Sequence, residues 1–110
     1  MKLSELLEEI SKAVDSARPV SPTEWIDWGI KLTRKWLELK DEMTKAYMMY
    51  KAEVSDLIEQ GKKVSEADRI VEGKSEAYRM YLYLKGRDVV VEEMIRLCKK
   101  KAMFEINMTE

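Results

Sequence analysis

The sequence carries a continuous helix signal that begins at a cap around Ser21 and ends at Gly61. The Ser21 hydroxyl is suited to accept a hydrogen bond from a free backbone N–H, and Pro22 suits the first helical position because its missing N–H is not needed there. Glu24, three residues after the cap, can complete a capping box. No proline and no strong stop follows until Gly61, which can adopt the left-handed conformation of a helix end. The signal predicts one helix over 22–60.

The length of this helix limits the architectures open to the chain. It would be about 58 Å long at 1.5 Å per residue, whereas a compact globule of this size is about 35 Å across. Either the helix breaks, or the molecule is elongated and needs a partner to cover it. We therefore expect an assembly or binding role rather than a catalytic one.

Composition supports a soluble helical protein and gives little sign of a nucleic-acid or membrane partner. Charged residues make up 37% of the chain, yet the net charge is −1, and both halves are close to neutral. There is thus no global basic field to attract nucleic acid. No apolar run approaches the ~20 residues that span a bilayer, and the N-terminus lacks the apolar stretch of a signal peptide. We expect a cytoplasmic protein with no membrane contact.

The absence of histidine and the single cysteine, Cys98, exclude many catalytic sites. Without histidine there can be no His-dependent triad, Cys–His dyad, His-containing zinc site or Glu-x-x-His di-iron motif. One cysteine allows no intrachain disulfide and no thiolate cluster within the chain. We expect Cys98 to be a buried thiol, and we expect no catalytic residues, no cofactor and no metal.

One remote enzyme alternative rests on acidic pairs. Glu24-x-x-Asp27 and Glu38-x-x-Asp41 place acids one turn apart, which resembles half of the Mg²⁺ site of the all-α nucleotide pyrophosphohydrolases. Those enzymes also need a Glu-Glu-x-x-Glu helix, and the first helix offers Glu5-x-x-Glu8-Glu9 instead. Acids at such spacing more often form a solvated helix face.

Three further helices are expected, over 3–17, 65–72 and 76–104. The first has apolar residues at three- and four-residue steps, and the prolines of the connector after it cannot lie inside a helix. Ser65 is the expected cap of the second, and Gly73 marks the expected break after it. Within 76–104, Gly86 and Asp88 suggest a kink or a short turn, with Asp88 as a new cap.

Apolar residues of the long helix recur at alternating steps of four and three, the heptad spacing of a coiled-coil seam. Glu53 interrupts this main stripe. A second, weaker stripe predicts two neighbours and a central place in the bundle. The main stripe comprises Trp25, Gly29, Leu32, Trp36, Leu39, Met43, Ala46, Tyr50 and Leu57, and the second comprises Ile26, Ile30, Leu37 and Met48.

We therefore predict one all-α domain over 1–110, an elongated antiparallel helical hairpin or three-to-four-helix bundle with a long central helix. Heptad seams on both long helices predict a homo-oligomer, with a C2 dimer the simplest form. Aromatic residues and methionine are enriched at protein interfaces, although the same spacing also suits a core. The expected interface residues are Trp25, Trp28, Trp36, Leu39, Met43 and Tyr50.

Five segments, 47–53, 61–69, 75–79, 84–88 and 94–97, carry a resemblance to a known class. They give a tyrosine-bearing helix, a Gly-Lys-x-Val-x-Glu turn and a second helix with Tyr-x-x-Tyr spacing. This pattern resembles small helical proteins of tailed bacteriophages and prophages, often encoded near recombination genes. The resemblance implies a phage or prophage origin, a location in the host cytoplasm and contact with DNA-processing proteins. It brings no catalytic residues, and the first 24 residues have no counterpart.

The expected function is that of a non-enzymatic interaction or assembly protein, which binds itself or another protein through its long helix. The alternative is a nucleic-acid-binding accessory protein of a recombination or replication module. That alternative would use a basic concentration for weak, salt-sensitive phosphate contacts. Basic residues near a helix C-terminus also complement the helix dipole, which is the simpler explanation. The residues are Lys85, Arg87, Arg96, Lys99, Lys100 and Lys101.

Overall fold

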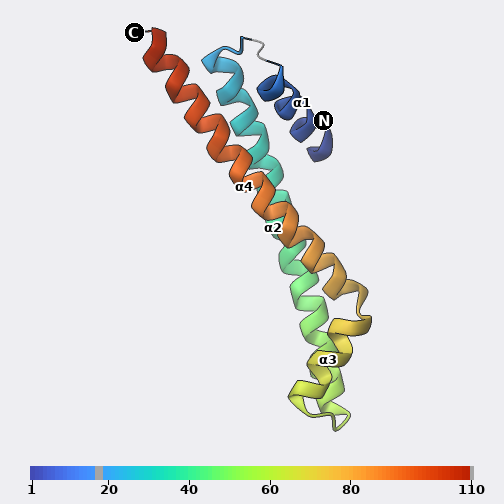
Figure 1. Cartoon of the computed structure of the whole chain (residues 1–110). Coiled ribbons are helices and arrows are strands. Elements are labelled where there is room, and N and C mark those ends of the chain that lie inside the picture. Colours follow the sequence, from blue (N-terminus) through green and yellow to red (C-terminus); the bar gives the residue numbers. More distant parts are fainter. Residues whose placement is uncertain (17–18, 110) are drawn as a thin grey trace. The chain divides into compact units, whose positions relative to one another are not determined.

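The described chain folds into four α-helices and no strands, which confirms the all-α class. A computed structural model describes residues 1–16 and 19–109, with side chains as far as residue 104. None of its helices has an apolar stretch long enough to cross a membrane, over the residues described. The helices are α1 (Leu3–Asp15), α2 (Pro22–Glu59), α3 (Val64–Lys74) and α4 (Glu76–Thr109), as Figure 1 shows.

Both ends of α2 form as their residues predict. The Glu24 backbone N–H donates to Ser21 Oγ at 3.2 Å, and the Ser21 N–H donates to Glu24 Oε2 at 3.3 Å, which completes the capping box. At the other end Gly61 has φ of 99°. The Lys62 N–H donates to the Leu57 carbonyl and the Gly61 N–H to the Ile58 carbonyl, the two bonds of a Schellman motif. The predicted range of 22–60 is confirmed to within one residue.

The ends of the shorter helices depart from the expected ranges. The first helix ends at Asp15 rather than 17, and residues 17–18 lie outside the described residues. Ser65 was wrongly predicted as the cap of α3. The helix begins one residue earlier, because Lys63 is extended and its carbonyl accepts the N–H of Ala67 at 2.9 Å. Backbone geometry at Lys63 therefore sets this helix start without a side-chain cap.

The break between α3 and α4 falls at Ser75, and Gly73 lies inside α3. The Ser75 hydroxyl donates to Glu53 Oε2 and accepts the N–H of Tyr78 at 3.1 Å, so that one side chain caps α4 and holds it to α2. Of the kink or short turn expected at Gly86 and Asp88, the turn is wrong, since α4 continues through both residues, and the kink stays a prediction. Asp88 has a tertiary partner instead, which is described below.

Contacts divide the chain into two compact units. Unit 1 contains Met1–Glu38 and Asp88–Glu110, and thus α1, the first part of α2 and the last part of α4. Unit 2 is Leu39–Arg87, which contains the rest of α2, all of α3 and the start of α4. Within each unit, the α2 and α4 segments are antiparallel (Figure 1). We describe each unit by itself, and the expectation of one domain over 1–110 stays a prediction.

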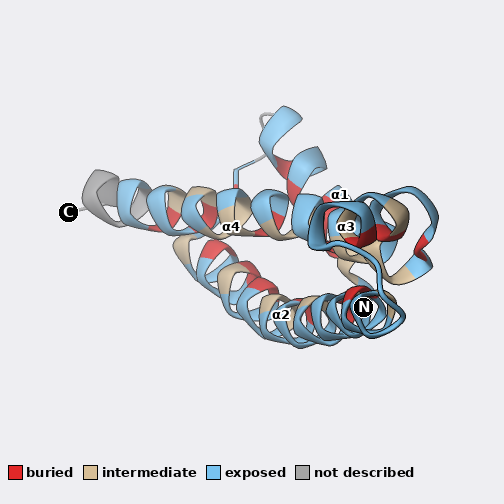
Figure 2. Ribbon diagram, turned by 90° about the horizontal axis from the view of Figure 1, so that it is seen from below, coloured by how far each residue is buried: buried red, intermediate tan, exposed pale blue. Residues whose placement is uncertain are grey.

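The predicted seams are the sides of the helices that turn inward. In unit 1, Trp25 and Leu32 of α2 and Val91 and Cys98 of α4 are buried (Figure 2). In unit 2, Leu39, Ala46 and Leu84 are buried, and Val54 takes over the stripe beside exposed Glu53. Full burial of one such large apolar side chain stabilises a fold by about 1.5–3 kcal/mol.

The second stripe of α2 was expected to face another helix of the bundle, and the structure corrects this. Its four residues are exposed on the single chain, each by 47% or more. Isolated exposed apolar side chains are common in soluble proteins, but a row of them along one helix face is a feature of interaction surfaces. Those residues are Ile26, Ile30, Leu37 and Met48.

Candidate functional site

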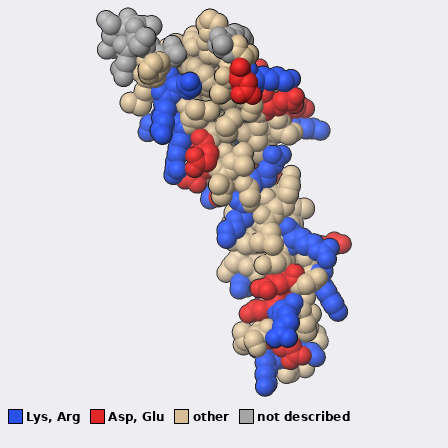
Figure 3. Space-filling view, in the orientation of Figure 1, with Lys and Arg blue, Asp and Glu red and all other residues tan. Residues whose placement is uncertain are grey.

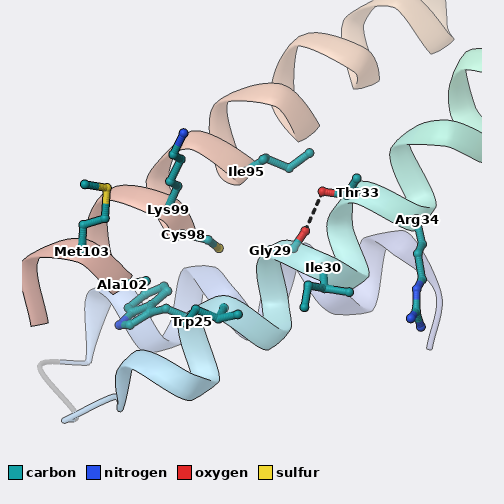
Figure 4. A pocket seen from close by; sticks show the side chains of 11 residues that line it. Trp25, Gly29, Ile30, Thr33, Arg34, Ile95, Cys98, Lys99, Ala102 and Met103 are labelled. Atoms are coloured by element: carbon teal, nitrogen blue, oxygen red, sulfur yellow. Dashed lines mark hydrogen bonds between the residues drawn. The ribbon is translucent and has the colours of Figure 1, made fainter. Parts of the chain in front are cut away.

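An apolar groove of about 480 Å³ lies between α2 and α4 of unit 1, and we call it the unit 1 groove. The α2 residues that line it recur at steps of one, three and four, which places them on one helix face. The facing residues of α4 lie opposite them (Figure 4). The lining consists of Trp25, Ile26, Gly29, Ile30, Thr33 and Arg34 from α2 and Ile95, Cys98, Lys99, Ala102 and Met103 from α4.

Small residues give the groove its depth. A Cβ built on Gly29 would lie 3.7 Å from the Cβ of Cys98, which is ordinary contact, so the packing of the helices does not require a glycine here. The small residues of the lining are Gly29 of α2 and Cys98 and Ala102 of α4. The Thr33 hydroxyl donates to the Gly29 carbonyl oxygen at 2.8 Å (Figure 4). The hydroxyl is thereby satisfied within α2, and the groove offers mainly apolar contacts.

Cys98 is the buried thiol that the sequence predicts. Its side chain is 1% exposed, and burial raises the pKa of the thiol from 9.0 to about 11. Desolvation disfavours the thiolate, and the thiolate is the reactive form. Cys98 is therefore a packing residue of the groove rather than a nucleophile.

The charged residues that line the groove, Arg34 and Lys99, are both basic. Both side chains are exposed, and Figure 4 shows them directed away from the apolar centre. No carboxylate is among the described lining residues, and none lies within ion-pair distance of either side chain among the described residues. The groove therefore combines an apolar centre with a basic edge.

Three of the six predicted interface residues are buried within one chain. Trp25, Trp28 and Leu39 are 3%, 6% and 6% exposed. The rings of the two tryptophans meet edge to face with centroids 5.1 Å apart. This is the core role that the sequence left open beside the interface role. Trp25 also lines the unit 1 groove, so it is the tryptophan that an occupant of the groove would contact.

The other three predicted interface residues are half-buried. Trp36 donates its indole N–H to Asp88 Oδ1 at 2.6 Å, and Met43 lies in the unit 2 part of α2. Tyr50 contacts three other tyrosines. The interface role of all six stays a prediction. The sequence missed Met103 and the exposed place of Ile26 and Ile30, although the second stripe did mark those two isoleucines.

A tyrosine cluster in unit 2 joins α2 to α4. Tyr50 lies 5.2 to 5.4 Å from the ring centroids of Tyr47, Tyr78 and Tyr81. Burial, and then the neighbouring tyrosines and Asp68, raises the pKa of Tyr50. Edge-to-face pairs of this kind are worth about 0.5–1.5 kcal/mol beyond their buried area. Packing between the two helices therefore explains the presence of these tyrosines.

Unit 2 has a second apolar depression, of about 500 Å³, which we call the methionine face. Its exposed apolar residues are Met49 and Met80, which are 62% and 52% exposed. Methionine is flexible and polarizable, and it is common on adaptable binding surfaces. The residues that line the face are Glu42, Lys45, Ala46, Met49, Glu53, Glu76, Ala77, Met80 and Leu84.

The predicted phosphate-contacting residues are divided between the two units. Arg87 of unit 2 lies over the ring of Tyr83, 5.8 Å from its centroid, and Lys85 is exposed. In unit 1, Arg96 is bound by Glu92 at 2.9 Å and Glu93 at 3.4 Å. Blue and red atoms accordingly lie side by side along this part of α4 (Figure 3). The basic residues that remain there are Lys99, Lys100 and Lys101.

The acidic pairs of the remote enzyme alternative take part in local helix contacts. Asp27 binds Lys31 at 2.9 Å and Asp41 binds Lys45 at 3.1 Å. Glu24 belongs to the capping box, and Glu38 lies 3.6 Å from Lys35. Within the described part of the chain, no three acidic or cysteine side chains come close enough together to hold a metal ion. The remote enzyme alternative stays a prediction.

Known proteins give no direct guide to this site. No protein-family model matches the sequence, and comparisons with curated proteins and with solved structures give no significant match. Function must therefore be argued from the residues of the groove and of the methionine face.

Proposed function

We propose that this protein is a non-enzymatic interaction protein that self-associates through the unit 1 groove. The observation that carries the proposal is the uncovered apolar lining of the groove. Ile30 is 48% exposed and Met103 is 56% exposed, and both line the groove. Each square ångström of apolar surface removed from water contributes about 25 cal/mol, so a helix face seated here would stabilise a complex.

The chemistry of the groove favours binding over catalysis. Its sulfur group is the neutral thiol of Cys98, and its hydroxyl, on Thr33, donates to a backbone carbonyl. A general acid, base or nucleophile needs a titratable or activated group that faces the reacting atoms. The titratable residues of the lining are the neutral Cys98 thiol and the side chains of Arg34 and Lys99, which point away from the apolar centre (Figure 4). Its apolar centre and basic edge suit a helix face of a protein instead.

Self-association through the groove can be tested by light scattering coupled to size exclusion. Wild-type protein is expected to have a mass above that of one 12.9 kDa chain. The Ile30→Asp variant places a charge in the groove and should run as a monomer. Val64→Asp is the matched control, because Val64 is exposed on α3 and lies outside the groove. A monomeric wild type would remove the proposal.

A second candidate function, nucleic-acid binding, is favoured by one observation. Lys99, Lys100 and Lys101 follow one another on α4, and none of them pairs with a described carboxylate. Three phosphate contacts would give weak binding that falls as salt rises. Retardation of single-stranded DNA at low salt, lost in a triple Lys→Gln variant, would support this function. No retardation at low salt would remove it.

The proposal extends to origin and location. The resemblance to small helical proteins of tailed phages and prophages supports a phage or prophage origin and work in the host cytoplasm. Contact with DNA-processing proteins follows from the same resemblance. A pull-down from phage-infected cells that recovers recombination proteins with wild type, but not with Ile30→Asp, would support this extension. Equal recovery with both proteins would show that contact with recombination proteins does not depend on the groove.

A further inference from the structure

We infer that the unit 1 groove of one copy receives the methionine face of a second copy, and that the pair makes this contact twice. The inference rests on the proposed function, because it names the surface that covers the groove during self-association. The observation that carries it is that one chain has two unlike apolar faces. One face is apolar with a basic edge, and the other is apolar with an acidic edge.

The charges of the two faces are complementary. Arg34 and Lys99 are the charged residues of the unit 1 groove. The methionine face has three acids, Glu42, Glu53 and Glu76, and one base, Lys45. The Lys45 ammonium is 3.1 Å from the carboxylate of Asp41, so a local partner already offsets its charge. The methionine face therefore presents net negative charge to an approaching surface.

Pairing between like faces is disfavoured by the same charges. Two unit 1 grooves placed together would bring two copies of Arg34 and two of Lys99 to one interface without a lining carboxylate. Two methionine faces would bring six glutamates together. Like charges that are placed opposite one another at an interface oppose association, whereas opposite charges steer and orient it. The crossed contact is the arrangement that places opposite charges together.

The apolar parts of the two faces also suit one another. The unit 1 groove presents branched, stiff side chains, Ile26 and Ile30, together with the small residue Gly29. Met49 and Met80 are unbranched and exposed, and they can adjust to fill such a space. When two copies make the contact in both directions, the interface is isologous and closes as a C2 dimer.

Paired charge reversals test the crossed contact. The first variant, Arg34→Glu with Lys99→Glu, makes both faces of its chain acidic. The second, Glu42→Lys with Glu76→Lys, makes both faces basic. All four side chains are exposed, so helical circular dichroism and the melting temperature should stay close to wild type. Each variant alone should dimerise about tenfold more weakly or worse.

An equimolar mixture of the two variants should restore the dimer, because every contact then joins an acidic face to a basic one. The four changes combined in one chain should restore the homodimer as well. Met49→Asp, a change on an exposed side chain, should weaken the dimer as Ile30→Asp does. Dimerisation constants from sedimentation equilibrium measure all of these effects.

Two results would overturn the crossed contact while the proposed function stands. If Glu42→Lys with Glu76→Lys dimerises as wild type does, the methionine face is not part of the interface. If Met49→Asp also leaves a dimer that Ile30→Asp disrupts, two grooves pair with each other instead. A wild type that is monomeric at every concentration would be a failure of the proposed function itself.

Discussion

Asp88 of α4 accepts a hydrogen bond from the indole N–H of Trp36 in α2, across 2.6 Å. Both residues are half-buried, and Trp36 belongs to the main apolar stripe of α2, where heptad spacing favours apolar side chains. A buried polar group without a hydrogen-bond partner is costly. The hydrogen bond from the Trp36 indole offsets this cost for the Asp88 carboxylate. This bond explains why a helix continues through an aspartate that the sequence marks as a cap.

Removal of this acceptor should destabilise the protein. We predict that Asp88→Ala lowers the free energy of unfolding by about 1.5–3 kcal/mol, the range for hydrogen bonds to charged groups. Asp88→Asn is the matched control, because its side-chain carbonyl can still accept from the indole. Urea denaturation followed by circular dichroism gives both values. Equal stability of the alanine and asparagine variants would show that the bond contributes nothing.

The junction of α3 and α4 should depend on the hydroxyl of Ser75. Ser75→Ala removes both the cap on Tyr78 and the bond to Glu53, so we predict a loss of about 1–2 kcal/mol. Ser75→Thr retains a hydroxyl and should lose less. Exchange of the Tyr78 amide hydrogen, measured by NMR, should become faster in the alanine variant. Unchanged exchange would contradict the cap.

Glycine substitutions should have opposite effects at two positions. Gly61→Ala forces a side chain into a left-handed conformation, with φ of 99°, and should cost about 1 kcal/mol or more. Gly29→Ala should stabilise the fold by up to about 1 kcal/mol, because alanine favours a helix and its Cβ meets Cys98 at ordinary distance. Thermal unfolding distinguishes the two. If Gly29→Ala destabilises the protein, the added Cβ has too little room beside Cys98. The two helices would then lie closer together than the 3.7 Å separation indicates.

The Cys98 thiol should react slowly in the folded protein. With a pKa of about 11 instead of 9.0, the thiolate fraction at pH 8 falls from about one in ten to about one in a thousand. Because the raised pKa favours the neutral thiol, the reaction should accelerate as the pH rises towards 11. A chromogenic thiol reagent at pH 8 measures the rate, with the denatured chain as control. A folded rate equal to the denatured rate would show an open thiol.

Local signals in the sequence were enough to predict much of the fold. The capping box at Ser21 and the Schellman motif at Gly61 are made by neighbours in the chain, so their residues alone predict them. The cap of α3 and the short turn at Gly86 and Asp88 were predicted wrongly, whereas a continuous helix over 76–104 was predicted correctly. At Asp88 the missing information is the distant partner Trp36, and at α3 it is the extended backbone of Lys63, which no side-chain cap marks.

The candidate site was less predictable than the fold. Heptad spacing shows that Trp25 and Ile30 each lie on an apolar stripe, but it does not show which stripe the rest of the chain covers. That depends on where α1 and α4 pack, and the structure buries Trp25 while it leaves Ile30 half exposed. The groove beside Gly29 likewise arises from small residues on two helices far apart in the sequence.

The mass of the wild-type protein tests self-association most directly. Sedimentation equilibrium over a hundredfold range of concentration, at low and at high salt, would give this mass. The account predicts a mass of two 12.9 kDa chains at high concentration, with tighter association at low salt. A mass of one chain at every concentration and at both salt levels would contradict it.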